Sequence, residues 1–215
     1  MNVIAVNGSP RKTWNTATLL RHALDGASSR GAAGEMVHLY DLDYKGCISC
    51  FACKLKGGKS YGRCAVSDGL RPVLDKIESA DGLVLGSPVY LGMVSGMMRC
   101  FLERLVFQYI VYDAQHSHLF KRKIRTGLIY TMNVPQERVA QMGYEEKFKG
   151  MEMSLGRVFG ACESLFVTDT CQFDDYAKYE SSLFNAEEKA ARRREVFPED
   201  CRKAFAMGAR LAAPQ

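Results

Sequence analysis

The fold is decided at residues 3–20, which read VIAVNGSPRKTWNTATLL. Four consecutive apolar residues at 3–6 predict a strand that is buried on both faces. Gly8 and Pro10 favour a tight turn after it, and apolar residues at helical spacing over 17–27 predict a helix that begins near Asn15. Strand, polar turn and helix together form the unit from which parallel sheets are built.

The rest of the chain repeats this unit. Apolar runs predict further strands at residues 36–39, 83–85, 126–130 and 164–167, the third of these five strands being closed by Gly86, Ser87 and Pro88. Helical spacing covers residues 70–77, 97–109, 146–159 and 186–211, with a break near Pro198. The sequence therefore predicts an α/β fold with a doubly wound, five-stranded parallel sheet. We expect a single domain over residues 1–215 with a cysteine-rich insertion at 47–64.

Composition excludes several classes of protein. The 215 residues are 47% hydrophobic, yet no run approaches the roughly 20 apolar residues of a membrane span, so we expect no membrane partner. The first residues lack the pattern of a signal peptide, and we expect a cytoplasmic protein with reduced thiols. The net charge is +5, and its one dense basic run, at 192–194, is interpreted as a solvated helix face. No nucleic-acid-binding motif is present, and we expect no such partner.

Ligands of doubly wound sheets bind beyond the carboxyl ends of the strands. After the first strand, Ser9, Asn15 and Thr16 offer hydroxyl and amide groups, and Arg11 and Lys12 offer positive charge. The N-terminus of the following helix points into the same loop, and this combination suits a phosphate. The alternative is that Asn15 or Thr16 is only a helix N-cap. Neither G-x-G-x-x-G nor the P-loop pattern is present.

Two motifs carry a resemblance to a known family. G-S-P-R-K-x-x-N-T at residues 8–16 and G-S-P-x-Y at 86–90 resemble the NAD(P)H-dependent FMN reductases of the flavodoxin-like superfamily, and among them the iron–sulfur flavoproteins. The resemblance implies a flavodoxin-like strand order 2-1-3-4-5 and an FMN site. It assigns the FMN phosphate to Ser9, Arg11, Asn15 and Thr16, and the flavin ring to Pro88, Val89, Tyr90, Leu91 and Gly92, with a third contact from Thr131, Met132 and Asn133. Trp14 departs from the pattern, because a small residue is usual there, and the segment at 86–96 can also be an ordinary turn with Ser95 as N-cap.

The most unusual feature is C-x-x-C-x-x-C at Cys47, Cys50 and Cys53, followed by Cys64. Four thiolates suit a 4Fe–4S cluster or zinc, and free redox-reactive thiols are a third alternative. The segment resembles the compact motif of iron–sulfur flavoproteins, although the gap before Cys64 is longer. The cysteines at 100, 162, 171 and 201 are interpreted as buried core residues.

By this resemblance the protein is an FMN-dependent oxidoreductase. It takes electrons from NAD(P)H, or from a ferredoxin-like donor, and passes them through FMN to a quinone, a flavin or a protein. No residue is assigned as catalytic, because the cofactor carries the chemistry. A homodimer or tetramer is expected, with the helix at 97–112 at its interface. The aromatic and acidic segment at 173–179 lines the flavin edge or the partner subunit, or is a structured turn.

Two other classes of function stay open. One is a non-enzymatic FMN electron carrier or redox sensor, which would bind FMN but oxidise NAD(P)H negligibly. The other is a zinc-stabilised interaction protein.

Overall fold

The computed structural model describes residues 1–213, and a parallel sheet lies at its centre. The strand order is β2-β1-β3-β5-β6. The parallel strands are β1 (Asn2–Asn7), β2 (Ala33–His38), β3 (Gly82–Tyr90), β5 (Ile124–Thr131) and β6 (Gly160–Val167). A short strand, β4 (Met93–Val94), turns back antiparallel onto the end of β3. The predicted flavodoxin-like order of five parallel strands is confirmed.

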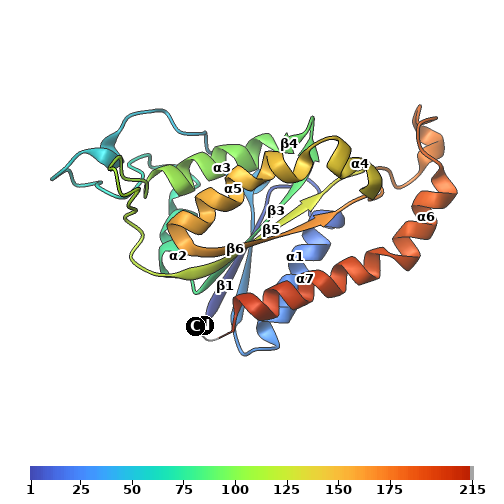
Figure 1. Cartoon of the computed structure of the whole chain (residues 1–215), viewed down its shortest axis with the longest axis horizontal. Coiled ribbons are helices and arrows are strands. Elements are labelled where there is room, and N and C mark those ends of the chain that lie inside the picture. Colours follow the sequence, from blue (N-terminus) through green and yellow to red (C-terminus); the bar gives the residue numbers. More distant parts are fainter. Residues whose placement is uncertain (214–215) are drawn as a thin grey trace.

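Helices cover both faces of this sheet (Figure 1). The helices α1 (Asn15–Ser28) and α7 (Phe197–Leu211) lie on one face. The helices α2 (Arg71–Ser79), α3 (Gly96–Phe107) and α5 (Tyr144–Phe159) lie on the other. The remaining elements are α4 (Gln136–Gln141), α6 (Ala186–Glu195) and the 3-10 turns η1 (Leu39–Asp41), η2 (Ala52–Lys54) and η3 (Tyr176–Lys178). No helix in residues 1–213 combines the length and the hydropathy that crossing a bilayer requires.

The strand residues form two cores because successive side chains point to opposite faces of the sheet. Ile4 and Val6 belong to the core beneath α2, α3 and α5, whereas Ala5 between them packs with residues of α1 and α7. All three side chains are fully buried. This is why the strands read as continuous apolar runs rather than as alternating ones.

The observed elements differ from the predicted ones in three places. Residues 86–88 were expected to close β3, but they continue it, and Pro88 pairs in register with Thr131 of β5. Because the pairing with β1 ends at Gly86, Pro88 has a strand neighbour on one side only, where a sheet tolerates proline. The break predicted near Pro198 in the final helix is confirmed, but it falls at Val196, so that Pro198 lies in the first turn of a separate helix, α7. The short elements α4 and β4 were not predicted from the sequence.

The close crossing of α1 and α7 depends on two glycines. A Cβ added at Gly26 would lie 1.9 Å from the Phe205 carbonyl oxygen, and one added at Gly208 would lie 1.7 Å from the Ala23 carbonyl oxygen. We expect Gly208→Ala to lower the free energy of unfolding by about 3 kcal/mol, because the backbones must separate. The matched control is Gly150→Ala in α5, where a Cβ would meet nothing within 4 Å. Alanine there should stabilise the protein by about 0.5–1 kcal/mol. Urea unfolding measures both changes, and similar values for the two variants would contradict the close crossing.

Candidate functional site

The loop after β1 is held by its own polar side chains. Asn7 Oδ1 accepts a hydrogen bond from the Ser9 N–H at 3.0 Å, and Ser9 Oγ accepts one from the Arg11 N–H at 3.2 Å. The helix α1 then begins with Trp14 in the capping position, without a side-chain cap and without an acidic residue in its first turn. The alternative in which Asn15 or Thr16 caps this helix is therefore wrong. Because the start of α1 lacks an anionic or capping side chain, its N–H groups are available to an anion.

The loop after β3 is a tight hairpin joined to the first loop. Leu91 and Gly92 take left-handed backbone angles, with φ of +50° and +81°, and connect β3 to β4. Ser95 caps α3 by accepting from the Met98 N–H, as the turn alternative predicted, and its hydroxyl donates to the Gly8 carbonyl oxygen at 2.6 Å. The segment at 86–96 therefore supplies the N-cap of α3, and the same Ser95 side chain joins this segment to the loop after β1.

Further hydrogen bonds bring in the loops after β5 and β6. Thr16 Oγ1 and Thr131 Oγ1 lie 2.7 Å apart, which joins α1 to the end of β5. Trp14 Nε1 and Asn15 Nδ2 donate to the Cys171 carbonyl oxygen at 3.1 and 2.9 Å, and Arg11 donates to that of Gln172 at 2.8 Å. Asn133 Nδ2 donates to Gln172 Oε1 at 3.0 Å. Loops from four parts of the chain thus form one connected structure.

Between these loops lies a pocket of about 620 Å³ at the carboxyl ends of β1, β3 and β5. This volume is within the usual range of about 300–1,000 Å³ for small-molecule sites. All the residues predicted to bind the cofactor, except Gly92, line it: Ser9, Arg11, Asn15, Thr16, Pro88, Val89, Tyr90, Leu91, Thr131, Met132 and Asn133. Gly92 instead completes the hairpin turn beside it. Burial, followed by the neighbouring Tyr40, raises the pKa of Tyr90, while Arg11 lowers it, so the phenol is protonated at neutral pH.

Sequence reasoning missed part of the pocket wall. Thr170, Cys171 and Gln172 line it, so Cys171 is not the buried core residue that we expected. Phe173 and Tyr179 also line it, with their rings stacked 4.1 Å apart. Of the alternatives for segment 173–179, the structure therefore places its two ends at the pocket, while Asp175 caps the η3 turn between them. The aromatic content of the segment was the available signal.

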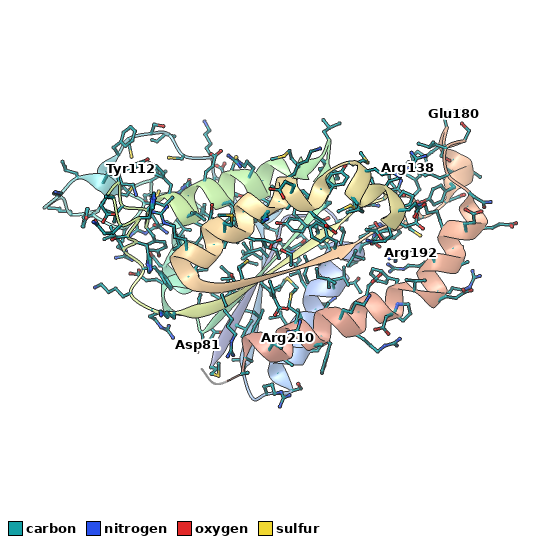
Figure 2. All side chains as sticks on the ribbon, viewed as in Figure 1. Asp81, Tyr112, Arg138, Glu180, Arg192 and Arg210 are labelled. Atoms are coloured by element: carbon teal, nitrogen blue, oxygen red, sulfur yellow. The ribbon has the colours of Figure 1, made fainter. Side chains whose placement is uncertain are left out.

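The helix α6 contacts these loops through two cationic side chains, Lys189 and Arg193, which lie one helical turn apart. Lys189 is buried, and its Nζ donates to Asp169 and to the carbonyl and side-chain oxygens of Asn133. Arg193 donates to Asn15 Oδ1 at 2.7 Å and lies over the rings of Trp14 and Phe197. Arg192 pairs with Asp200 at 2.6 Å near the junction with α7, where it is labelled in Figure 2. The interpretation of residues 192–194 as a solvated face is therefore wrong for two of its three arginines, and only Arg194 is exposed.

The cysteine-rich segment lies at the other end of the molecule. Figure 2 shows Tyr112 at that end, and its ring contacts Phe107, which contacts Phe51 within the cysteine motif. Cys47 and Cys50 are exposed, Cys53 is buried and Cys64 is intermediate, and all four line one small pocket against the end of α3. Ser49 and Phe51, between these cysteines, take left-handed backbone angles of φ +54°.

The four cysteines of the motif share a pocket, but their side chains are not arranged as a metal-binding group. In residues 1–213, no group of three or more His, Cys, Asp or Glu side chains is arranged to hold a metal ion. Burial raises the pKa of the Cys53 thiol, Lys54 lowers it, and the other three cysteines of the motif raise it further. The other three thiols thus lie close enough to Cys53 to affect its ionisation.

The fold is flavodoxin-like, and the pocket enclosed by the loops after β1, β3 and β5 lies at the carboxyl edge of the sheet, where ligands of such folds bind. Residues 1–153 match the family described as NADPH-dependent FMN reductase. The chain belongs to this family. The matched residues include the loops after β1, β3 and β5, whereas Cys171, Lys189 and Arg193 lie beyond them.

Curated relatives match about half of the chain. An iron–sulfur flavoprotein of Methanocaldococcus jannaschii is 38% identical over 104 residues, which cover 48% of this chain and 51% of the relative. An iron–sulfur flavoprotein of Archaeoglobus fulgidus is also 38% identical over 104 residues, with 48% of each chain covered. The chain spans about half the length of the curated relatives it matches.

Solved structures share the fold along the whole chain. An NAD(P)H:quinone oxidoreductase from Methanothermobacter marburgensis superposes with a TM-score of 0.68 at 14% identity and covers 98% of both chains. An azoreductase from Bacillus anthracis superposes with a TM-score of 0.67 at 13% identity, covering 97% of this chain and 99% of its own. At these identities the likeness shows the fold alone.

The ion pair of Lys189 with Asp169 allows a test of how the loops after β5 and β6 are held together. We expect Lys189→Met to lower the free energy of unfolding by about 2 kcal/mol, because Asp169 and Asn133 lose their shared donor. Adding Asp169→Asn should recover part of this loss, since asparagine removes the unpaired charge and tolerates the left-handed angle at that position, φ +52°. Lys203→Met on the exposed face of α7 is the control, with an expected change within about 0.5 kcal/mol. Equal effects of the two single substitutions in urea unfolding would contradict the role of Lys189.

Proposed function

We propose that this protein is an FMN-dependent oxidoreductase that takes electrons from NAD(P)H, or from a ferredoxin-like donor. It passes them to a quinone, a flavin or a protein acceptor. The observation that carries this proposal is the pocket itself, which combines an uncapped helix N-terminus with two further loops at the carboxyl edge of the sheet. Membership of the NADPH-dependent FMN reductase family supports it.

The phosphate of FMN is assigned to the start of α1. The N–H groups of its first turn, the hydroxyls of Ser9 and Thr16 and the guanidinium of Arg11 are suited to a dianion. One donor each of Arg11 and Asn15 already holds the loop at 171–172, so these side chains also shape the wall. Arg193 lies outside the pocket and acts through Asn15 Oδ1.

The flavin ring is assigned to the walls formed by residues 88–91 and 131–133. Tyr90 and Leu91 are exposed to 45% and 105%, and they present apolar surface at the mouth of the pocket. Gly92 contributes the left-handed turn that this hairpin requires, rather than a contact. The stacked rings of Phe173 and Tyr179 form a flat wall opposite, which suits a planar nicotinamide or acceptor.

When bound, FMN supplies the hydride and electron chemistry of the site. The chain supplies binding, orientation and a partly apolar surrounding, and no side chain of the pocket is assigned as an acid or a base. Steady-state oxidation of NADH and NADPH with quinone and free-flavin acceptors tests the activity. An FMN-binding protein that fails to oxidise either nucleotide would be an electron carrier or sensor instead.

The four cysteines are proposed to hold a 4Fe–4S cluster. The donor set fits, because four thiols line one pocket and four thiolates are the usual ligands of such a cluster. The pocket also contains a buried polar atom without a partner, the Nε of Arg104. Two of the curated relatives bear the name iron–sulfur flavoprotein and support the assignment. Zinc and free thiols are the other outcomes of the iron test below.

The protein is further proposed to form a homodimer or tetramer. Large apolar side chains beside the pocket mouth, Leu91 and Met93, are 105% and 46% exposed. Such surface favours an interface, and α3 continues from it; this helix ends at Phe107, short of the predicted end at residue 112.

The proposed position of the FMN phosphate can be tested by substituting two neighbouring cationic residues, Arg11 and Lys12. We expect Arg11→Ala to weaken FMN binding about tenfold or more, because a charge-assisted hydrogen bond is lost. Lys12→Ala is the control, since Lys12 pairs with Asp41 at 2.6 Å and does not line the pocket. Titration of the flavin-free protein with FMN and with riboflavin measures the effect. Riboflavin affinity should not change, and an equal loss for both ligands would argue against a phosphate at Arg11. Absence of flavin, even after FMN is added, would overturn the proposed function.

The cluster can be tested by metal analysis. Anaerobically purified protein should contain about four irons per chain together with flavin. Cys50→Ser should lose the iron and keep the flavin, whereas Cys201→Ser, on the buried face of α7, should keep both. Stoichiometric zinc without colour would indicate the interaction protein, and flavin without metal would return these cysteines to thiol chemistry.

A further inference from the structure

Arg104 is a buried cation whose hydrogen bonds can be counted completely. The residue lies in α3 and is 2% exposed. Its NH1 group donates to Asp68 Oδ2 at 2.5 Å and to the Lys45 carbonyl oxygen at 3.2 Å. Its NH2 group donates to Asp68 Oδ1 at 3.0 Å and to the Val66 carbonyl oxygen at 3.3 Å. A guanidinium has five N–H donors, so these bonds leave only Nε–H.

That fifth donor lacks a partner. Among residues 1–213, Nε of Arg104 is one of a few buried side-chain atoms without a hydrogen bond. A buried unsatisfied donor is costly, and such an atom in a native structure calls for an explanation. Asp68 does not supply one, because its carboxylate contacts the two terminal nitrogens of the guanidinium and not Nε.

The surroundings of Arg104 indicate the missing acceptor. Arg104 lines the same small pocket as Cys47, Cys50, Cys53 and Cys64. Burial lowers the pKa of Arg104, whereas the Asp68 carboxylate and the adjacent Cys64 thiol raise it by more, so the side chain remains charged. Cys64 itself is anchored to the same helical segment, since its N–H donates to Gln108 Oε1 at 2.8 Å. Sulfur is therefore the acceptor that the pocket offers to Nε–H.

We propose that Nε–H of Arg104 donates a hydrogen bond to a sulfur of the cysteine-ligated cluster, at or beside Cys64, and thereby raises the cluster's reduction potential. This inference rests on the proposed 4Fe–4S site. Reduction adds one electron to the cluster and exchanges no proton or ligand. A hydrogen bond to sulfur stabilises the added negative charge, and such bonds are among the factors that set cluster potentials. The bidentate contact with Asp68 offsets the charge of the guanidinium, so the hydrogen bond is the main contribution.

Two substitutions separate the hydrogen bond from the charge. Arg104→Lys keeps a cation within reach of Asp68 but has no donor at the Nε position. Asp68→Asn keeps Nε–H and removes the counter-charge. Arg71→Lys is a control, because Arg71 donates to the Cys64 carbonyl oxygen and pairs with Asp75, but does not line the cysteine pocket.

The measurement is a dithionite titration of the FMN- and iron-loaded protein, followed by the EPR signal of the reduced cluster. We expect Arg104→Lys to bind the wild-type amount of iron and to be about tenfold harder to reduce, a shift of about 59 mV to lower potential. Asp68→Asn should leave the potential unchanged or raise it, and Arg71→Lys should leave it unchanged. A wild-type potential in iron-loaded Arg104→Lys would overturn the inference and leave the proposed function intact. Wild-type protein that binds FMN but no iron after reconstitution would overturn both the cluster assignment and this inference.

A second measurement uses wild-type protein and so does not require Arg104→Lys to fold. Wild-type protein containing ¹⁵N-arginine should show coupling between a guanidinium nitrogen and the reduced cluster in pulsed EPR. The coupling should persist in Arg71→Lys, which excludes the neighbouring arginine as its source. Absence of any arginine coupling in the iron-loaded wild type would overturn the proposal.

Discussion

Burial of the sheet on both faces is the constraint on which the rest of this structure depends. Because α1 and α7 cover one face and α2, α3 and α5 the other, the side chains in the middle of the central strands are mainly apolar. At the carboxyl ends of the central strands, polar residues such as Asn7, Ser87 and Thr131 follow these apolar runs. Parallel strands place their carboxyl ends at one edge, so the polar loops after β1, β3 and β5 meet there and form a pocket. The site is in this sense a consequence of how the core is buried.

Side-chain hydrogen bonds between distant segments give this pocket its shape. Ser95 joins α3 to the β1 loop, Thr16 joins α1 to β5, and Cys171 accepts from both Trp14 and Asn15. The buried Lys189 adds a charged contact between the loops after β5 and β6. Its helix lies outside the residues that match the FMN reductase family, as does the aromatic wall of Phe173 and Tyr179. The matched part of the chain thus forms the loops assigned to the cofactor, and the C-terminal part encloses the remaining side of the pocket.

One helix connects the two regions of chemical interest. As Figure 1 shows, α3 begins beside β4 and ends at the cysteine-rich segment. The β3 end of this hairpin lines the pocket. Its 12 residues correspond to a length of about 18 Å. Ser95 caps it at the first end, while Arg104 and Gln108 contact the cysteine segment at the other. The positions of the pocket and of the cysteines are therefore related through a single rigid element, and the buried pair of Arg104 with Asp68 fixes the second end.

Apolar runs and turn residues are local signals, so the sequence alone determined the parallel α/β class and the edge of the sheet at which the pocket lies. The strand order, and nearly all of the pocket residues in the loops after β1, β3 and β5, followed from motifs that resemble those of the FMN reductases. Tertiary structure alone decided the rest. The extension of β3 through Pro88 depends on where its neighbour β1 ends, and the burial of Arg193 depends on Trp14 and Asn15, which are distant in the chain. The pocket wall at Cys171 and the unpaired Nε of Arg104 are likewise invisible in the sequence. A sequence pattern reports what each segment buries, whereas the partner of a polar group is set by which distant segment packs against it.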